Sequence, residues 1–555
     1  MDNNAIADNF SMLARLIDIH GDNSFKSKTY AAAAFTIEKL TVQLANTPRE
    51  KLFSIKGIGE STGKKVVELL ETGKLEILDE YIKNTPPGVI EMLNIKGLGP
   101  KKINTIWKVM EIDSLGELLY ACNENRLTRF KGFGETTQKN IPQGIEFYFS
   151  NQGYFLYAEL EEIFPQVENY LKRIFTSEKV HITGKYRRQE LVIEELEFVV
   201  LESNAVIKPK FQTAQPPELI HETENSIQYK LKNGLKLHLY TGGNNMAAEL
   251  FRTTGNSDFL TAFTEAFPDL SFNSLKGESD KAVFEILDMP FIPPCLREEK
   301  AIIDKAQKGQ LPALIQPEDI RSVIHSHSNW SDGANSIGEM AEECIRKGLE
   351  YLVISDHSKT AAYANGLKED RIAEQHKYID VINNKLSPFK VFKSIESDIL
   401  NDGSLDYSEN VLKTFDLVIA SVHSNLGMTE EKANQRLLKA IENPYTRILG
   451  HMTGRLLLSR NGYPVNHKLI IDACAANNVV VEINAHPRRL DMDWRWVDYA
   501  LQKGLLLSIN PDAHSTDGFH DVKYGVLAAQ KGGLTKEHNL SSFSLQQFTK
   551  WLKSK

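Results

Sequence analysis

Seven short apolar runs near the carboxyl end of the chain constrain its fold more than any other feature. The runs are SVIHSHS, YLVISDH, VFKSIESD, DLVIASVH, TRILGH, VVVEINAH and LLLSINPDAH, and a segment of helical length separates each run from the next. Strands that alternate with helices form parallel βα units. When such a sheet closes into a barrel, the carboxyl ends of the strands meet on one face, which is where chemistry is built. The sequence therefore predicts a βα barrel with a functional site on that face.

Residues of metal-binding types follow six of these runs directly. The candidate ligands are His325, His327, Asp332, His357, Glu396, His423, His451, Asp512 and His514. His-x-His at one strand end and Asp-x-His at another place pairs of ligands on one face of a strand, as a site with several ions requires. Imidazole mixed with carboxylate suits zinc, manganese or iron and does not suit magnesium or calcium. One such histidine is more often a core residue, but nine candidates at strand ends predict a metal centre.

Three segments in the first 150 residues share one pattern. They are IKGIGESTGKK from Ile55, IKGLGPKKI from Ile95 and FKGFGETTQKN from Phe130, each with the order apolar, Lys, Gly, apolar, Gly. Two glycines let the backbone approach a phosphate closely, and the free N–H groups of the following helix point at it. The pattern is typical of a helix-hairpin-helix, which grips the nucleic-acid backbone without reading bases, although a tight turn between packed helices is the alternative. The candidate DNA-binding residues are Gly57, Gly59, Gly97, Gly99, Gly132, Gly134, Lys64, Lys101 and Lys102.

The charge of the chain argues against binding nucleic acid through a broad basic field. The formal net charge is −8, and residues 1–150 carry as many lysines and arginines as acidic residues. DNA binding must therefore come from the local geometry of the hairpins. The amino terminus lacks the pattern of a signal peptide, no apolar run approaches the roughly 18 residues that span a membrane, and the four cysteines are widely spaced. We expect a cytoplasmic, nucleoid-associated protein without a membrane partner.

The motifs along the chain resemble a known family. The barrel region resembles the polymerase and histidinol phosphatase (PHP) superfamily, whose fold is a distorted seven-stranded βα barrel with three metal ions. DNSFKSKTYAAAAFTIEKL is similar to the amino-terminal lyase domain of family X DNA polymerases, PPGVIEMLNIKGLGPKKI to their fingers and DMPFIPPCLREE to the end of their thumb. Together these segments resemble bacterial PolX proteins, in the order of that family, over almost the whole chain.

The resemblance and the segment lengths imply a multidomain chain. We expect a lyase-like helical domain at 1–85, fingers at 86–150, a polymerase palm at 151–240, a thumb at 241–300, a linker at 301–318 and a PHP metallo-phosphoesterase domain at 319–555. The expected fold class is an all-α helix-hairpin-helix region, an α+β palm and thumb, and a distorted (β/α)7 barrel. The linker is expected because REEKAIIDKAQKGQLPALIQPEDI is polar and contains two prolines.

The segment GKYRRQELVIEELEFVV departs from the polymerase pattern of the family. Members typically read Gly-Ser-x-Arg-Arg-Gly, then Asp-x-Asp on the next strand and a third Asp further on, but here Lys185 replaces the Ser and Gln189 the second Gly. The resemblance places Glu195, Glu197 and His238 at the three Asp positions. Each Glu is one methylene longer than Asp, and a neutral imidazole removes one negative charge, whereas a magnesium pair needs closely placed oxygen ligands. We expect nucleotide addition to be lost or weak, with Mg²⁺ a cofactor only if this site is active.

The resemblance also implies a role for each ligand candidate of the barrel. Family members place His325, His327, Glu396 and Asp512 around one ion, Glu396, His423 and His451 around a second, and Asp332, His357 and His514 around a third. The expected cofactor is zinc or manganese, up to three ions, with His325, Glu396 and Asp512 as catalytic residues and His486 a doubtful ligand. Lys359, Arg455, Arg488 and Arg489 follow strand ends and are candidate phosphate contacts, with ordinary surface charge as the alternative. Val323 and Ile324 stand where the superfamily often has an Asp before His-x-His, which predicts weaker tuning of the first ion.

Three functions stay open from the sequence. The first is a DNA-repair nuclease, in which the hairpins and the polymerase-like body hold gapped, nicked or abasic DNA while the barrel acts as a 3′-5′ exonuclease or cleaves at abasic sites. The second is a working gap-filling polymerase with an attached exonuclease, and the third is a non-catalytic DNA-binding scaffold. Lys65 falls where the family places its Schiff-base lysine, while Ser61 stands at the neighbouring Lys position, so lyase activity is a further open question. The complete ligand set favours the nuclease, which we expect to act as a monomer.

Overall fold

The computed structural model describes residues 1–55, 57–123, 127–212, 216–272, 275, 277–458 and 461–554. Lys56 of the first glycine hairpin therefore lies outside the described residues. The chain forms two compact units, Met1–Gln152 and Gly153–Lys555. Within the described ranges, none of the helices is both long and apolar enough to cross a membrane.

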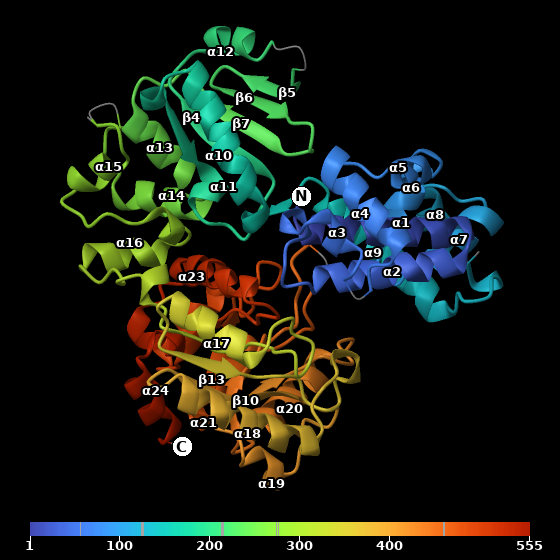
Figure 1. Cartoon of the computed structure of the whole chain (residues 1–555). Helices are drawn as coiled ribbons and strands as arrows, with labels where there is room; N and C mark the ends of the chain where they lie inside the picture. Colours follow the sequence, from blue (N-terminus) through green and yellow to red (C-terminus); the bar gives the residue numbers. More distant parts are fainter. Residues whose placement is uncertain are drawn as a thin grey trace. The chain divides into compact units, whose positions relative to one another are not determined.

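The first unit consists of helices (Figure 1). They are α1 (Asn3–His20), α2 (Ser24–Glu38), α3 (Arg49–Leu52), α4 (Glu60–Thr72), α5 (Glu76–Lys83), α6 (Pro87–Glu91), α7 (Pro100–Asn104), α8 (Leu115–Asn123) and α9 (Glu135–Asn151). Phe10, Leu13 and Ile17 recur at helical spacing along α1 and are buried in the core of the unit. Asp2 caps this helix by accepting a hydrogen bond from the N–H of Ala5.

The three glycine pairs each lead into a helix. Gly57, Gly97 and Gly132 have φ angles of 92°, 88° and 96°, in the left-handed region that a residue with a Cβ rarely adopts. The second glycine of each pair, Gly59, Gly99 and Gly134, is the N-cap of α4, α7 and α9. The first N–H groups of these helices have no partner within the helix. The local geometry is therefore that of the predicted helix-hairpin-helix elements.

The second unit begins with a five-stranded sheet in the order β2-β4-β7-β6-β5. The strands are β2 (Val180–Thr183), β4 (Glu195–Val200), β5 (Glu218–Thr223), β6 (Ser226–Lys230) and β7 (Lys236–Tyr240). β4 and β7 pair in parallel, and the other neighbours are antiparallel. Two short strands, β1 (Phe155–Leu156) and β3 (Val192–Ile193), pair separately, and the helices here are α10 (Tyr157–Ile174), α11 (Gly184–Arg187) and α12 (Asn204–Lys210). Leu160 of α10 is buried in the same core as Phe198 of β4, so α10 covers one face of the sheet.

A small helical core follows the sheet. The helices α13 (Met246–Thr254), α14 (Ser257–Ala266), α15 (Lys281–Glu285) and α16 (Lys300–Gln307) pack around a cluster that includes Phe251 and Phe284. α16 lies in the segment that the sequence predicts to be a linker, because Ile302 and Ile303 bring apolar surface that is buried in this core. The first part of 301–318 is thus folded. The finer domain boundaries at residues 85, 240, 300 and 318 stay predictions.

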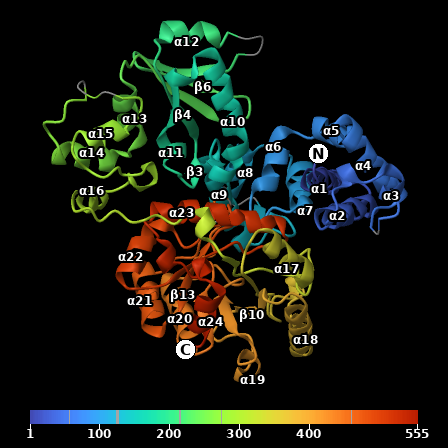
Figure 2. The ribbon, with the colours of Figure 1, turned by 60° about the vertical axis from the view of Figure 1, so that its left-hand side comes forward.

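Seven parallel strands form the sheet of the carboxyl-terminal region, in the order β14-β13-β12-β11-β10-β9-β8. The strands are β8 (Ser322–Val323), β9 (Tyr351–Ile354), β10 (Lys390–Asp398), β11 (Leu417–Ser421), β12 (Thr446–Leu449), β13 (Val480–Asn484) and β14 (Leu507–Asn510). Figures 1 and 2 show helices around these strands, which are α17 (Ile337–Arg346), α18 (Glu369–Lys385), α19 (Glu409–Leu412), α20 (Glu430–Ile441), α21 (His467–Asn477), α22 (Val497–Gln502), α23 (Val522–Lys531) and α24 (Leu545–Leu552). A parallel bridge between Ser326 and Ala513 joins the segments after β8 and β14, so the barrel nearly closes. The predicted fold class is confirmed.

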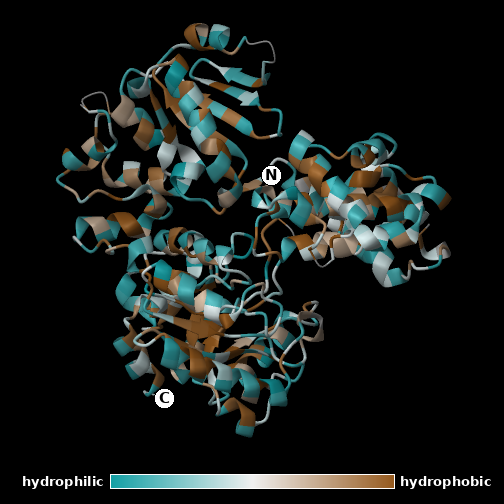
Figure 3. Ribbon diagram, in the orientation of Figure 1, coloured by the Kyte–Doolittle hydropathy of each residue, from teal (hydrophilic) through white to brown (hydrophobic). Residues whose placement is uncertain are grey.

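Figure 3 shows that the strands of the barrel are apolar, as expected for parallel strands that are buried on both faces. Ile419 and Val481 are fully buried, and all four residues of β9 are buried. The surrounding helices begin at sequence-encoded caps. In α17, for example, Ser336 and Glu339 each accept a hydrogen bond from the backbone N–H of the other. This packing fixes where each strand ends, and therefore where the predicted ligands lie.

Candidate metal centre

The nine predicted ligands gather at the carboxyl ends of six of the seven strands. His325 and His327 follow β8, His357 follows β9, Glu396 lies on β10, His423 follows β11, His451 follows β12, and Asp512 and His514 follow β14, while Asp332 lies in the loop after His327. The parallel strands place these positions at one face of the barrel.

Glu396 lies at the centre of the cluster, and its carboxylate has five imidazoles around it. Its Oε1 lies 3.2 Å from Nε2 of His325, 3.1 Å from Nε2 of His423 and 3.1 Å from Nε2 of His451. Its Oε2 lies 3.0 Å from Nδ1 of His357 and 3.6 Å from Nε2 of His327. The Glu396 side chain is fully buried, so this carboxylate depends on its neighbours for compensating charge.

Three groups of donor atoms could each hold an ion. They are His325, His327 and Asp512; His327, Asp332, His357 and His514; and His357, Glu396 and His423, each with its donor atoms within 4.8 Å of one another. The geometry adds His327 to the group predicted around Asp332, and His357 to the group predicted around His423. His451 lies outside these three groups but contacts Glu396. Neighbouring groups therefore share ligands, which sequence spacing does not reveal.

Carboxylates outside the predicted ligand set orient two of the histidines. Nδ1 of His325 lies 2.6 Å from Oε2 of Glu482, and Nδ1 of His423 lies 2.5 Å from Oδ1 of Asp398. A ring that donates its Nδ1–H to a carboxylate keeps the lone pair of Nε2 for a metal ion. In both rings Nε2 is directed at Glu396. The residues of the cluster therefore fit a metal centre.

The charges in the cluster also fit divalent cations. Burial lowers the pKa of His325, but Glu482, Asp512 and Glu396 outweigh burial and hold this pKa well above its ordinary value. Burial raises the pKa of Glu396, but His423, His325 and His357 hold it well below its ordinary value. The carboxylates are thus ionised, and they attract either protons or metal ions to the rings. Protons and metal ions compete for these histidines.

Glu482 is a residue of this centre that the sequence analysis did not identify. It also accepts hydrogen bonds from the N–H of His451 at 3.1 Å and from the side-chain amide of Asn510 at 2.8 Å. It lies on β13, within the apolar run VVVEINAH, and a carboxylate at a buried strand position requires such partners. A glutamate within an apolar strand was the signal from which Glu482 could have been identified. Glu482 supplies to His325 the carboxylate that is missing at Val323 and Ile324.

Arg489, one of the four basic candidates, forms an ion pair with a predicted ligand. Its Nε lies 3.6 Å from Oδ2 of Asp512. Arg455 donates hydrogen bonds to the carbonyl oxygen of Arg489 and to the carboxylate of Asp493. Arg455 thus holds the loop that carries Arg489.

The other two basic candidates contact surface carboxylates. Lys359 pairs with Glu369 at 2.7 Å, and Arg488 pairs with Glu159 at 3.3 Å. His486, on the same loop as Arg488, belongs to none of the donor groups found among the described residues. The doubt about His486 as a ligand therefore stands.

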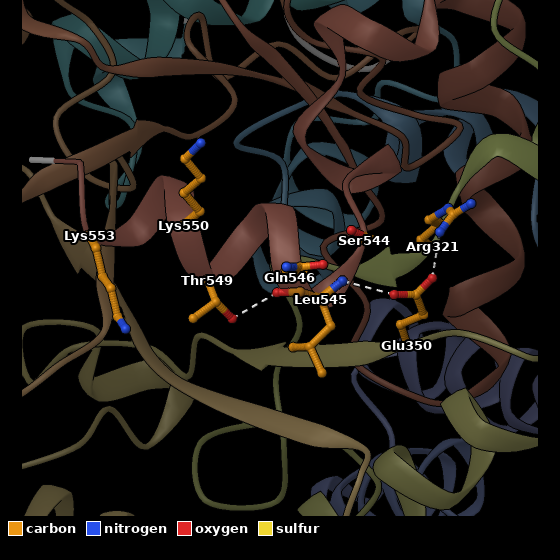
Figure 4. Close-up of a pocket in the computed structure, with 8 residues that line it drawn as sticks. All are labelled: Arg321, Glu350, Ser544, Leu545, Gln546, Thr549, Lys550 and Lys553. Atoms are coloured by element: carbon orange, nitrogen blue, oxygen red, sulfur yellow. Dashed lines mark hydrogen bonds and ion pairs between the residues drawn. The ribbon is translucent and has the colours of Figure 1, made fainter.

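A pocket of about 710 Å³ lies at the opposite end of the barrel (Figure 4). It is lined by Arg321, Glu350, Ser544, Leu545, Gln546, Thr549, Lys550 and Lys553. Arg321 and Glu350 directly precede β8 and β9, so the pocket is at the amino ends of the strands. Arg321 pairs with Glu350 at 2.7 Å, and Glu350 accepts a hydrogen bond from the N–H of Leu545. These contacts attach α24 to the barrel, and the pocket includes none of the predicted ligands.

Lys185 and Glu197 of the polymerase-like site, which also includes Glu195 and His238, have partners within the protein. Glu197 accepts a hydrogen bond from the N–H of Lys185 at 2.7 Å and another from the hydroxyl of Tyr240 at 3.0 Å. Glycine is required at position 184, since a Cβ there would lie 1.8 Å from Oε2 of Glu197. Nζ of Lys185 pairs with Glu194 at 2.7 Å.

The two arginines of GKYRRQ are also paired. Arg187 binds both oxygens of Asp280, each at 2.8 Å. Arg188 donates to the carbonyl oxygen of Thr254 at 2.7 Å and pairs with Glu298 at 3.3 Å. These contacts join α11 to the helical core that follows the sheet.

The predicted DNA-binding lysines lie at the surface of the first unit. Lys64 pairs with Glu60 at 2.7 Å, and Nζ of Lys102 donates to the carbonyl oxygen of Gly97 at 3.1 Å. Lys101 is exposed at the start of α7, and Lys65 is half-buried in α4. The lyase role of Lys65 stays a prediction.

Comparisons with known proteins agree with this architecture. Residues 1–75 match the model of a helix-hairpin-helix domain, residues 89–143 that of a SAM-like helix-hairpin-helix tandem, and residues 324–486 that of a PHP domain. The fold and the cluster thus define a protein that combines helix-hairpin-helix elements with a PHP barrel.

Similarity over the whole chain identifies the family. A Bacillus subtilis protein named DNA polymerase/3′-5′ exonuclease PolX is 30% identical over 565 residues, which cover 98% of this chain and 97% of that protein. This chain belongs to the PolX family, as predicted. It is also similar to a probable phosphatase of Caldanaerobacter subterraneus (30% identity, 29% of this chain and 60% of that protein) and to one of Thermoanaerobacter pseudethanolicus (25% identity, 42% and 94%).

Proposed function

We propose that this chain is a metal-dependent phosphodiesterase that shortens DNA strands as a 3′-5′ exonuclease, with cleavage at abasic sites as a second reaction of the same centre. The cluster of nine carboxylate and imidazole groups at the strand ends carries this proposal. The helix-hairpin-helix elements support DNA as the substrate, held through its backbone. The name of the Bacillus subtilis relative supports the same reaction. We propose gapped, nicked or abasic DNA as the substrate and a monomer as the acting species.

Zinc or manganese is the proposed cofactor, with up to three ions held by His325, His327, Asp332, His357, Glu396, His423, His451, Asp512 and His514. When bound, such ions supply Lewis-acid stabilisation of a phosphoester and a nucleophilic water at neutral pH. Glu482 and Asp398 hold the Nδ1–H groups of His325 and His423 and so keep both rings in the orientation that binding requires. Arg489, beside Asp512, is the proposed contact for a phosphate oxygen.

We propose that nucleotide addition is lost or weak. Glu197 accepts a hydrogen bond from the N–H of Lys185. The side chain of Lys185 pairs with Glu194, and that of Arg188 pairs with Glu298. A triphosphate that bound here would have to displace these interactions, at the cost of exposing or unpairing the carboxylates. Gap filling is the second candidate function, favoured by the five-stranded sheet and by the name of the Bacillus subtilis relative.

One assay separates the candidate functions. The chain is incubated with gapped DNA that carries a labelled primer, in Mn²⁺, with and without deoxynucleoside triphosphates. The proposal predicts that the primer shortens in both reactions and that the variant with His325→Ala and His327→Ala leaves it unchanged. Strong lengthening in the presence of triphosphates would support the polymerase, and an unchanged primer with wild-type protein would support a binding scaffold.

A further inference from the structure

A second cluster of metal-ligand residues lies in the five-stranded sheet. Glu195 and Glu197 belong to β4 and His238 to β7, and Glu197 pairs with His238 in the register of these parallel neighbours. One donor atom from each of the three side chains lies within 4.8 Å of the others. Positions i and i+2 of a strand point to one face, so the sheet itself directs both carboxylates toward the imidazole.

The two carboxylates of this cluster have mainly neutral partners. Glu197 accepts hydrogen bonds from a backbone N–H and from a tyrosine hydroxyl, and Glu195 accepts one from the side-chain amide of Gln228. Among the described residues, no lysine or arginine forms an ion pair with either carboxylate, because Lys185 pairs with Glu194 instead. Glu197 is buried, so little solvent offsets the charge of its carboxylate.

His238 has no hydrogen-bond partner for either ring nitrogen in the part of the chain that the structure describes. Both nitrogens are buried, and the side chain as a whole is 18% exposed. Nδ1 lies 3.5 Å from Oε1 of Glu195, and the ring stacks on Tyr240 with 4.3 Å between centroids. A buried imidazole without hydrogen bonds is costly, and coordination of an ion would satisfy one of its nitrogens.

We propose that Glu195, Glu197 and His238 bind one transition-metal ion of the zinc or manganese class, at a structural site separate from the barrel centre. Carboxylate oxygens with one imidazole nitrogen are donors that these ions accept, whereas magnesium prefers oxygen ligands alone. The ion offsets the two negative charges and ties β4 to β7. The three donor atoms form a single group, which suffices for one ion with water as a further ligand. The proposal does not depend on the nuclease function of the barrel.

The test compares three forms of the full chain. They are the wild type, the double variant Glu195→Gln with His238→Gln, and the control Glu218→Gln, which changes an exposed carboxylate of the same sheet outside the cluster. Each protein is equilibrated with buffered free zinc, separated from unbound zinc and analysed for metal per chain. We expect the double variant to hold one zinc ion fewer than the wild type and the control, with unchanged hydrolysis of a small phosphoester by the barrel. Equal zinc content in all three folded proteins would overturn the proposal.

A single variant keeps the test decisive if the double variant does not fold. Glu195→Gln preserves the shape of the side chain and removes one charged ligand. Competition with a chromophoric chelator should then show the affinity of one zinc ion falling by about tenfold or more relative to Glu218→Gln. The same zinc affinities for Glu195→Gln and Glu218→Gln would contradict the site.

Discussion

Glu482 illustrates how a single buried carboxylate sets what a neighbouring histidine can bind. It accepts the Nδ1–H of His325 and leaves Nε2 directed at Glu396. The nine candidate ligands were predictable from sequence, since all but Asp332 lie at the end of an apolar run. Glu482 was not, because its partners come from β8, β12 and β14, which are distant along the chain.

We expect Glu482→Gln to weaken metal binding without unfolding the barrel. The amide keeps the size of the side chain but is a poorer acceptor for His325, so zinc affinity at the barrel should fall about 10- to 100-fold. Chelator competition measures the affinity, and circular dichroism checks the fold. Glu431→Gln, an exposed substitution on α20, is the control. Wild-type affinity in Glu482→Gln would show that this carboxylate does not position the ring.

Asp280 is a second buried carboxylate, bound by Arg187 and Arg297. The Asp280 and Arg297 side chains are fully buried and lie 2.5 Å apart. Burial raises the pKa of Asp280, but the two arginines outweigh burial and lower it to about 2. A carboxylate with a lowered pKa stabilises the fold above its ordinary pKa of 3.8, and this contribution is lost as the pH falls through about 2.

We expect Asp280→Asn to lower the free energy of unfolding by about 3 kcal/mol at neutral pH, because it leaves the buried Arg297 without its charged partner. Urea unfolding at pH 7 measures the difference, and Asp269→Asn, at an exposed position, is the control. The difference between wild type and variant should shrink below pH 4. A variant as stable as the wild type at pH 7 would contradict the assigned role of this ion pair.

At the scale of elements, some segments could be predicted from their own sequence and others could not. The glycine hairpins follow from local sequence, because a positive φ and a helix start are encoded within a few residues. The segment GKYRRQEL shows the limit of such reasoning. Its altered residues were visible in the sequence, but the contact of Glu197 with the N–H of Lys185 depends on how α11 packs on β4. The folding of α16 within the expected linker likewise depends on a core that its own sequence does not specify.

We expect Gly57→Ala to destabilise the first hairpin by about 1–3 kcal/mol, because the left-handed φ strains a residue with a Cβ. The new Cβ would also lie 2.8 Å from Oγ1 of Thr36. Gly116→Ala is the matched control, since a Cβ there meets nothing within 4 Å. Thermal unfolding and DNA affinity are measured for both variants. If both behave alike, the conformation of the hairpin does not matter for either property.

At the scale of the whole molecule, the proposed function separates binding from chemistry. In this proposal the hairpins within Met1–Gln152 hold the DNA backbone, and the barrel within Gly153–Lys555 carries the metal centre. The net charge of −8 leaves little long-range attraction for DNA, so binding depends on a limited number of phosphate contacts. The sequence predicted both regions because their motifs are local, whereas their finer boundaries stay predictions.

This division predicts different salt dependences for two substrates. Phosphate contacts release counterions, so cleavage of dilute DNA should fall about tenfold or more between roughly 50 and 200 mM salt. Hydrolysis of a small phosphoester needs no such contacts and should change by less than about twofold over the same range. Initial rates for the same preparation of the full chain measure both. Equal salt dependence would contradict a role for the hairpins in holding DNA.

The most decisive experiment measures how fast the variant with His325→Ala and His327→Ala shortens a DNA strand, together with its affinity for that DNA. We expect shortening to fall by about 100-fold or more, since these side chains are proposed to hold the metal centre, while DNA affinity stays within about twofold of wild type. A variant that binds zinc less tightly but still shortens DNA at the wild-type rate would place the chemistry outside the barrel and contradict the proposed function.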